Sequence, residues 1–167
     1  MNRKILIFAL IFGLIGVFSC ETMDDPEMET TSTFPLNGEY WVTYSIGGSV
    51  VVDYQELIIT NTSADDGQHI LMTEPVVLVD DAGDEIPAKA NVNMDNLTFS
   101  LDNFTFDVND STTQTVSIEN GKFMEESYTT AAGNKTDSIY MDMIIHDSGD
   151  TLAVSGYKYT GWPADDH

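Results

Sequence analysis

The sequence predicts an all-β fold, a single antiparallel β-barrel of about eight or nine strands, with a β-sandwich as the alternative. Apolar and polar residues alternate with a period of two in many short windows, and no window sustains the 3.6-residue period of an amphipathic helix. Clusters of Gly, Asn and Asp separate these windows. The segment from Leu36 to Trp162 is long enough to bury one core and too short for two typical domains.

Four windows in the first half of this segment are rich in β-branched and aromatic residues, which favour strands. The predicted strands cover residues 39–46, 50–61, 70–79 and 88–94. The connections between them are short, so we expect sequential strands to pair as neighbours, as in an up-and-down barrel or a sandwich.

The second half of the domain offers turn signals that predict hairpins. A two-residue turn at Asp102-Asn103 would fold residues 97–108 into a hairpin and place Phe99 opposite Phe106 on one apolar face. Asn120-Gly121 is the strongest two-residue turn signal in the chain.

A third hairpin is predicted around the four residues 147–150. In that register Ile145 lies opposite Leu152 and Met143 lies opposite Val154, so the large apolar side chains share one face.

The first 19 residues have the layout of a secretory leader. Arg3 and Lys4 precede an apolar run over residues 5–18, which is shorter than the about 20 residues that a membrane-spanning helix needs. We therefore expect residues 1–19 to be a signal peptide that is removed.

Cys20 directly follows the leader and is the single cysteine of the chain, so no intramolecular disulfide can form. The sequence Val17-Phe18-Ser19-Cys20 resembles the lipobox of bacterial lipoproteins. That resemblance implies that Cys20 carries lipid and holds the mature protein on a membrane, for which more than one acyl chain is required.

Residues 20–33 are acidic and polar and predict a flexible tether, followed by the barrel domain over residues 34–167. Acidic residues just behind the lipidated cysteine also resemble the surface-export signal of Bacteroidota lipoproteins. The expected location is the outer membrane, at the cell surface; a solvated linker without an addressing role is the other interpretation.

The charge of the chain excludes one class of partner. The formal net charge is −22, and the leader holds two of the basic residues, Arg3 and Lys4. A field of this sign repels nucleic acid and anionic lipid surfaces.

None of the acidic loops completes an EF-hand, since the run from Asp107 has Ile118 where the bidentate Glu should stand. We therefore expect no metal ion and no cofactor.

The two ends of the domain resemble a known family. The C-terminal residues 156–167 carry a Gly-Tyr-basic-x-Thr-Gly-aromatic ending with an acidic tail, and residues 36–42 are similar to the opening strand of lipocalin-like barrels. The C-terminal pattern resembles the lipid-binding putative hydrolase family of Bacteroidota lipoproteins. This resemblance implies a lipocalin-like barrel and an apolar, lipid-like ligand.

No sequence motif supports hydrolase activity. The sequence contains no Gly-x-Ser-x-Gly, and His69, His146 and His167 form no pair with metal-ligand spacing. Two carboxylates could still meet in space in a chain this acidic, so we name no catalytic residue and leave enzymatic activity open.

Aromatic residues at the two ends of the domain are the candidate ligand-binding residues. The first and last strands of a closed barrel are neighbours, so these aromatic side chains are expected to cluster: Trp41, Tyr44, Tyr157, Tyr159 and Trp162. They could serve as core and closure residues or as an aromatic wall for an apolar ligand or a sugar ring. We expect a pocket that opens near Trp41 and Tyr157.

The sequence as a whole predicts a membrane-anchored envelope lipoprotein that binds an apolar or amphipathic small ligand. Two other functions stay open. One is a non-catalytic accessory subunit of an outer-membrane nutrient-uptake complex, and the other is a weak hydrolase.

Overall fold

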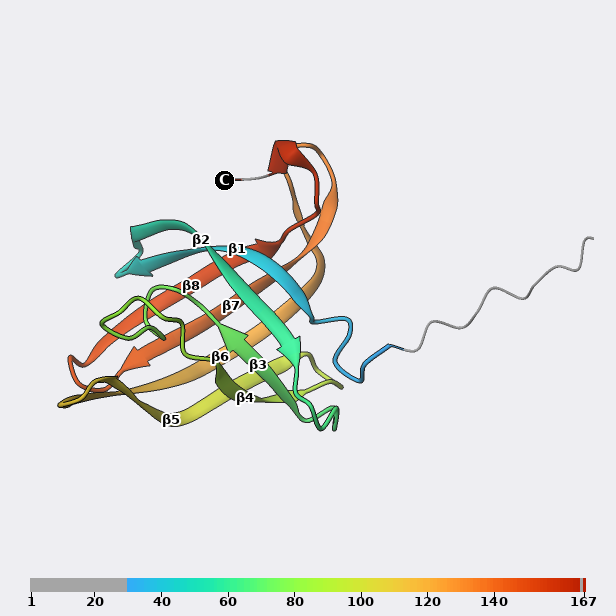
Figure 1. Cartoon of the computed structure of the whole chain (residues 1–167). Coiled ribbons are helices and arrows are strands. Elements are labelled where there is room, and N and C mark those ends of the chain that lie inside the picture. Colours follow the sequence, from blue (N-terminus) through green and yellow to red (C-terminus); the bar gives the residue numbers. More distant parts are fainter. Residues whose placement is uncertain (1–29, 166) are drawn as a thin grey trace, which may run out of the picture. The chain divides into compact units, whose positions relative to one another are not determined.

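The protein is a closed, eight-stranded antiparallel barrel in which each strand pairs with its sequence neighbours and β1 pairs with β8 (Figure 1). The computed structural model describes residues 30–165 and 167. The predicted signal peptide, Cys20 and most of the predicted tether lie outside the described residues. The strands are β1 Gly38–Ile46, β2 Ser49–Asn61, β3 His69–Thr73, β4 Ala88–Asn93, β5 Thr98–Asn109, β6 Thr112–Thr129, β7 Lys135–Ile145 and β8 Asp150–Lys158.

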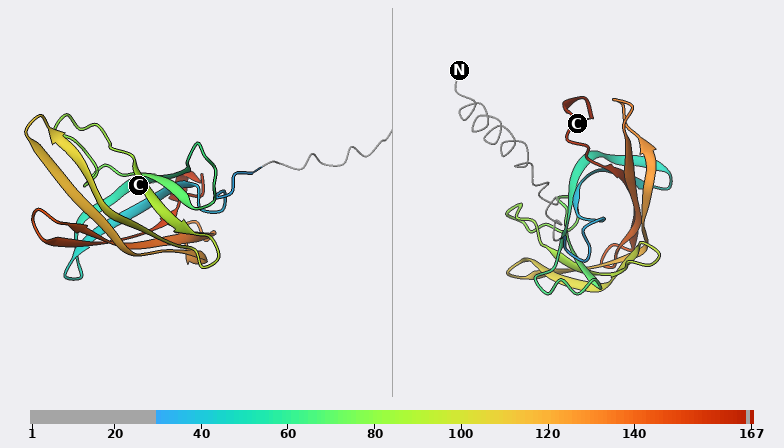
Figure 2. Two further views of the ribbon diagram at one scale, coloured as in Figure 1. Left: turned by 90° about the horizontal axis from the view of Figure 1, so that it is seen from below. Right: turned by 90° about the vertical axis from the view of Figure 1, so that its right-hand side faces the viewer.

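The prediction of a barrel of about eight or nine strands is confirmed, with eight strands. Seen from the side at which residues 31–37 reach β1, the strands form a ring (Figure 2, right). The remaining regular element is a short 3-10 helix, Pro163–Asp165. Within the described part of the chain, no helix is long and apolar enough to cross a bilayer.

Alternation along the strands builds the core. In β1 the side chains of Tyr40, Val42 and Tyr44 are buried inside the barrel, whereas those between them face outward. Residues from all eight strands join one apolar cluster, and each large side chain buried there stabilises the fold by about 1.5–3 kcal/mol.

The strands predicted at residues 39–46, 50–61 and 88–94 are present with nearly the same bounds. The strand predicted at 70–79 is shorter, since β3 ends at Thr73. Residues 74–87 form a loop instead, in which Val79 makes a single bridge to Glu85.

The predicted hairpin at Asp102-Asn103 is wrong. Residues 98–109 form one continuous strand, so Phe99 and Phe106 are both buried but lie on the same strand. Asn103 has a positive φ of 45°, which an asparagine tolerates well. This conformation accommodates a bulge rather than a turn, and the amide of Asn103 donates a hydrogen bond to Ser117 Oγ at 3.0 Å.

The predicted turn at Asn120-Gly121 is also wrong, because β6 continues through it as an 18-residue strand. Asn120 again has a positive φ, 53°, at an irregularity between β6 and its neighbours. Gly121 is required there because a Cβ atom would lie 2.8 Å from the Phe99 ring and closer still to the Phe99 carbonyl.

The third hairpin is present in a register that differs by two residues from the predicted one. Met143 lies opposite Leu152, and Met141 lies opposite Val154. A shift of two leaves every side chain on its predicted face, since the side-chain period of a strand is two. Met141, Met143 and Val154 are accordingly buried.

The strand ladders that close the barrel differ in length. β2 pairs with β3 only over Ile58–Asn61, and β4 pairs with β5 only over Asn91–Asn93. At the end of the barrel where β3 stops, the 74–87 loop lies beside β5. Its Val77 and Leu78 side chains are buried in the core, and its Asp81 amide donates to Val108 O at 2.9 Å.

Glu74 fixes this loop. Its buried carboxylate accepts hydrogen bonds from the backbone amides of Val76, Val77 and Leu78, at 2.6–2.9 Å. The hydroxyl of Tyr44, inside the barrel, donates a fourth bond at 2.6 Å. Burial first, and then the Glu74 carboxylate, raise the pKa of Tyr44, so this hydroxyl stays a donor.

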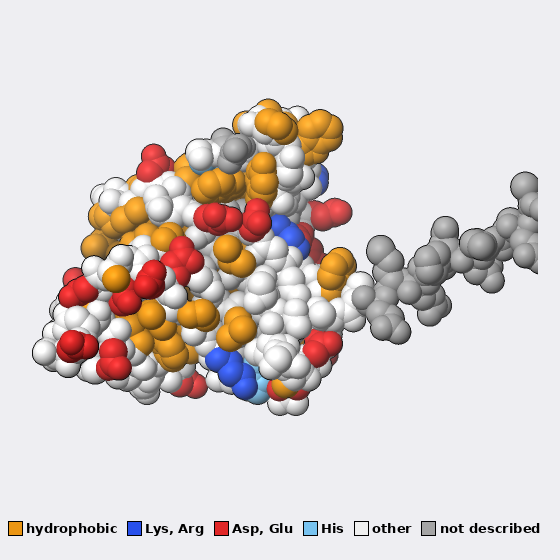
Figure 3. All heavy atoms as spheres, in the orientation of Figure 1, with side chains coloured by type: hydrophobic (Ala, Val, Ile, Leu, Met, Phe, Trp, Pro, Cys, Tyr) orange, Lys and Arg blue, Asp and Glu red, His pale blue; other side chains and the backbone are white. Residues whose placement is uncertain are grey.

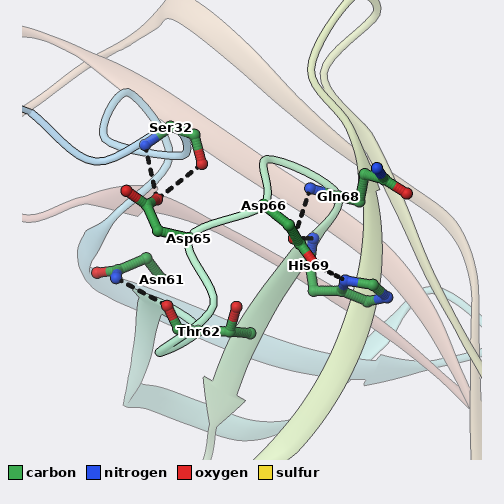
Figure 4. A network of polar contacts seen from close by, with 7 residues as sticks. All are labelled: Ser32, Asn61, Thr62, Asp65, Asp66, Gln68 and His69. Atoms are coloured by element: carbon green, nitrogen blue, oxygen red, sulfur yellow. Dashed lines mark hydrogen bonds and ion pairs between the residues drawn. The ribbon is translucent and has the colours of Figure 1, made fainter.

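The residues before β1 pack onto the opposite end of the barrel (Figure 4). Both the amide and the hydroxyl of Ser32 donate to Asp65 Oδ1, at 2.8 and 2.7 Å, in the loop between β2 and β3. Thr33, the last residue of the predicted tether, is buried. The chain therefore joins the barrel at the end away from the β1–β2 hairpin.

Candidate functional site

An aromatic cluster covers the outer wall of the barrel where β1 meets β8. The ladder places Trp41 opposite Tyr157, and both positions face outward because Tyr40 and Val42, on either side of Trp41, face inward. Tyr157 is nevertheless only 4% exposed. Other aromatic side chains cover it from outside.

Two pairs of parallel rings form the cover. Tyr128, from β6, stacks on Tyr157 with centroids 4.3 Å apart and planes at 5°. His167 stacks on Tyr54, from β2, at 3.7 Å and 7°. Tyr54 in turn meets Tyr157 edge-on at 6.2 Å, so the two stacks make one aromatic cluster.

A groove of about 290 Å³ lies beside this cluster on the outer wall. Tyr54, Tyr128 and Tyr157 contribute its rings. Small side chains form the floor between them, because the outward positions of neighbouring strands are Thr43, Ser138 and Ser155. We call this the aromatic groove; its lining is Thr43, Tyr54, Met124, Tyr128, Ser138, Ile139, Tyr140, Ser155, Gly156 and Tyr157.

A second, more polar groove of about 610 Å³ adjoins the first, and Tyr140 lines both. The Tyr140 hydroxyl donates to Asp142 Oδ1 at 2.6 Å, and Lys122 Nζ lies 5.3 Å from the centre of the Tyr140 ring. Asn120 Nδ2 donates to the other oxygen of Asp142 at 2.7 Å. This polar groove therefore offers one cation, one anion and a tyrosine within a few side chains of the aromatic groove.

Raised pKa values keep three of the groove tyrosines neutral at pH 7: Tyr54, Tyr140 and Tyr157. Burial first, and then the nearby Tyr128, Tyr54 and Asp165, raise the pKa of Tyr157 to about 12. The hydrogen bond to Asp142 is the largest cause of the raised pKa of Tyr140. Both hydroxyls already have partners, Asp142 for Tyr140 and His167 or the Asp165 carbonyl for Tyr157, so a ligand can use them as hydrogen-bond acceptors.

The C-terminal residues are attached to the cluster through Asp165. Its side chain accepts hydrogen bonds from the Ala132 amide at 2.9 Å and the Thr160 hydroxyl at 2.7 Å. Burial would raise the pKa of Asp165, but the bonds from Thr160, Ala132 and the other donors outweigh it and lower that pKa. Beyond Asp165, the imidazole of His167 reaches the Tyr157 hydroxyl.

The structure brings together three of the five aromatic residues proposed from the sequence. Trp41 and Tyr159 meet edge-on at 6.3 Å, beside Tyr157. Tyr44 lies inside the barrel instead, bonded to Glu74, and Trp162 is exposed in the C-terminal segment. A ligand-binding role for all five residues stays a prediction.

Sequence reasoning missed Tyr54, Tyr128 and His167. Tyr54 lies in a strand that was predicted with nearly correct bounds, and its odd spacing from the apolar Leu57 and Ile59 was the available signal for an outward position. Tyr128 could not be found, because the predicted turn at 120–121 ended its strand too early.

One serine–histidine contact bears on hydrolysis. Ser117 Oγ and His146 Nε2 are 2.8 Å apart, within reach for proton transfer. Ser117 is buried, however, and its oxygen already accepts the amide of Asn103. The pair therefore fixes the bulge of β5 against β6 and β7. Among the described residues, no group of three or more His, Cys, Asp or Glu side chains could hold a metal ion.

Comparison with known proteins identifies the family of the chain. No curated protein matches the chain. The model of a family described as lipid-binding putative hydrolase matches residues 25–163, which cover the whole barrel. The chain belongs to the lipid-binding putative hydrolase family.

Proposed function

We propose that this protein is a lipid-anchored envelope protein that binds an apolar or amphipathic small ligand, and that the aromatic groove holds the apolar part of that ligand. The observation that carries the proposal is the arrangement of Tyr54, Tyr128 and Tyr157 around a floor of small side chains. Aromatic side chains with a few placed polar groups are typical of ligand sites.

The outer wall fits this role better than the barrel interior. The interior holds bulky buried side chains such as Tyr40, Tyr44 and Phe123, and Phe123 packs at 4.8 Å against Phe99. Most side chains that line the two grooves stand at outward positions, although the buried Phe99 and Ile139 also contribute. The proposed site therefore lies beside Tyr157, on the outer side of the barrel wall.

The two adjoining grooves favour an amphipathic ligand. The aromatic groove, at about 290 Å³, is at the lower end of the range of about 300–1,000 Å³ for ligand pockets and suits one ring or a short stretch of acyl chain. The polar end of such a ligand would extend past Tyr140 toward Lys122 and Asp142. A zwitterionic or hydroxyl-rich head group matches this pair of charges.

Replacing Tyr128 with alanine is expected to weaken ligand binding by at least about 5-fold, because it removes one wall of the groove and the ring stacked on Tyr157. The measurement is titration with dodecylphosphocholine below its critical micelle concentration, followed by NMR chemical shifts. The dye 1-anilinonaphthalene-8-sulfonate provides a second, fluorescent probe.

Phe34→Ala is the matched control, since Phe34 is an exposed aromatic residue outside both grooves and its loss should leave binding unchanged. Ala90→Trp distinguishes the groove from the interior, because Ala90 is fully buried inside the barrel. Equal binding by Tyr128→Ala and wild type, or loss of binding in a folded Ala90→Trp variant, would contradict the assignment to the outer wall.

The membrane anchor is the second part of the proposal, and it rests on the lipobox-like residues that end in Cys20. Cys20→Ser should move the protein from the membrane fraction to the soluble fraction, because no thiol remains for lipidation. Fractionation and immunoblotting measure the shift. A variant that still sediments with membranes after a high-salt wash would refute the anchor and leave the proposed groove untouched.

A further inference from the structure

The β1–β2 hairpin carries apolar side chains that the core does not use. Ile46, Val50 and Val51 are 45%, 60% and 51% exposed. Val50 and Val51 are consecutive, so they lie on opposite faces of the strand, and both faces are therefore open to solvent. We call residues 46–51 the hairpin tip.

The adjoining part of β2 has a free edge. β2 pairs with β1 along its length, but its ladder with β3 covers only Ile58–Asn61. Within the part of the chain that the structure describes, no ladder occupies the other edge of Ser49–Tyr54. Backbone donors and acceptors on such an edge can pair with a further extended segment.

The end of the barrel that carries the hairpin tip is rich in acidic side chains. The turns β1–β2, β3–β4, β5–β6 and β7–β8 lie at the same end of the barrel, at the left of Figure 1, and none of the four contains Lys or Arg. In Figure 3, acidic and apolar side chains are mixed over this end. The acidic residues of these turns and the strand ends beside them are Asp53, Asp80, Asp81, Asp84, Glu85, Asp107, Asp110, Asp147 and Asp150.

We propose that this end of the barrel is a docking surface for another protein, which adds an extended segment to the free edge of Ser49–Tyr54. The chemistry at the edge defines that segment: apolar residues to contact Ile46, Val50 and Val51, flanked by Lys or Arg to match the surrounding carboxylates.

Charge and position both favour this occupant. A second copy of the chain carries the same net charge of −22 and the same acidic turns, so like charges would face each other. An anionic lipid surface is repelled for the same reason. Residues 31–37 join the barrel at its other end, at the right of Figure 1, so the docking surface lies away from the point at which the chain reaches the domain.

A synthetic peptide tests the proposal directly. The probe is fluorescein-labelled Lys-Lys-Val-Thr-Val-Thr-Val-Lys-Lys, titrated with the full chain carrying Cys20→Ser and followed by fluorescence anisotropy. The protein with an unchanged docking surface should bind this peptide with a micromolar dissociation constant, and that constant should rise as the salt concentration increases. Control peptides replace every Lys with Glu or methylate alternate backbone nitrogens, and neither should bind.

Protein variants locate the contact. The double substitution Val50→Glu, Val51→Glu should weaken peptide binding at least about 10-fold, since it removes the apolar contact and adds charge to the edge. Phe34→Glu is the matched control, because Phe34 is 56% exposed at the other end and its change should leave the affinity unaltered. Absence of peptide binding, or equal binding by the double variant, overturns the proposal. Two other results would also overturn the proposal, because they would assign the hairpin tip to another occupant. In one, the protein sediments as a dimer; in the other, it sediments with phosphatidylcholine vesicles; in both, the double variant abolishes the effect.

Discussion

Gly156→Ala is expected to lower the free energy of unfolding by at least about 3 kcal/mol, because the added methyl group has no space between β8 and β1. A Cβ atom at Gly156 would lie 2.7 Å from Val42 Cα and closer still to the Trp41 carbonyl. Both neighbours are backbone atoms of the strand that closes the barrel, so neither can move without breaking the ladder. Urea denaturation followed by tryptophan fluorescence measures the effect.

Ser155→Ala is the control for this experiment. Ser155 precedes Gly156 but faces outward, so its replacement should change the free energy of unfolding by less than about 0.5 kcal/mol. If Gly156→Ala unfolds at the same urea concentration as wild type, the register of β1 against β8 is wrong, and the position of Trp41 beside Tyr157 is wrong with it.

Glu74→Ala should cost about 3–5 kcal/mol, since it leaves two buried loop amides, one part-buried loop amide and the Tyr44 hydroxyl without acceptors. The 74–87 loop would lose its attachment to Tyr44. Calorimetric unfolding measures the stability, and hydrogen exchange of the Val77 and Leu78 amides reports whether the loop is released.

Two further substitutions separate the parts of this effect. Tyr44→Phe removes one donor and should cost only about 1–2 kcal/mol. Glu74→Gln keeps the volume but turns one acceptor oxygen into a donor facing other donors, so its cost should fall between those of Tyr44→Phe and Glu74→Ala. A Glu74→Ala protein as stable as wild type would show that the amides find other acceptors.

Local alternation was sufficient to predict three of the four strands in the first half of the barrel, whereas the strand predicted at 70–79 ends at Thr73. Residues 39–46, 50–61 and 88–94 form strands, because each window is short, bounded by turn residues and apolar on one face. The β7–β8 hairpin was predicted for the same reason. Its exact register was not, because a shift of two residues gives the same pattern of faces.

Two asparagine residues are the reason why the turns predicted in the second half of the domain are wrong. Asn103 and Asn120 both adopt positive φ, the conformation that makes Asn a turn former, but each does so at a bulge within a long strand. A residue in the left-handed backbone conformation can end a strand or only bend it. The outcome depends on which neighbouring strand pairs with the strand that contains the residue. That partner lies far away in the sequence, and no local signal identifies it.

The candidate site was predictable only in part for a related reason. Pairing of the first and last strands was expected and places Trp41 beside Tyr157. Tyr54 and Tyr128 reach the same place through the curvature of β2 and β6, which follows from bulges in both strands. Trp41 and Tyr44 are three positions apart, so alternation along β1 places them on opposite sides of the wall, and the expected aromatic cluster did not take this into account.

The β1–β8 ladder joins residues 40–45 to residues 153–158, so the contact that completes the barrel links the two ends of the domain. Contacts between residues distant in sequence slow folding, because the chain must lose the entropy of a long loop before they form. Until β8 reaches β1, the outer edge of β1 is exposed, and a chaperone that shields an N-terminal strand should raise the yield of folded protein.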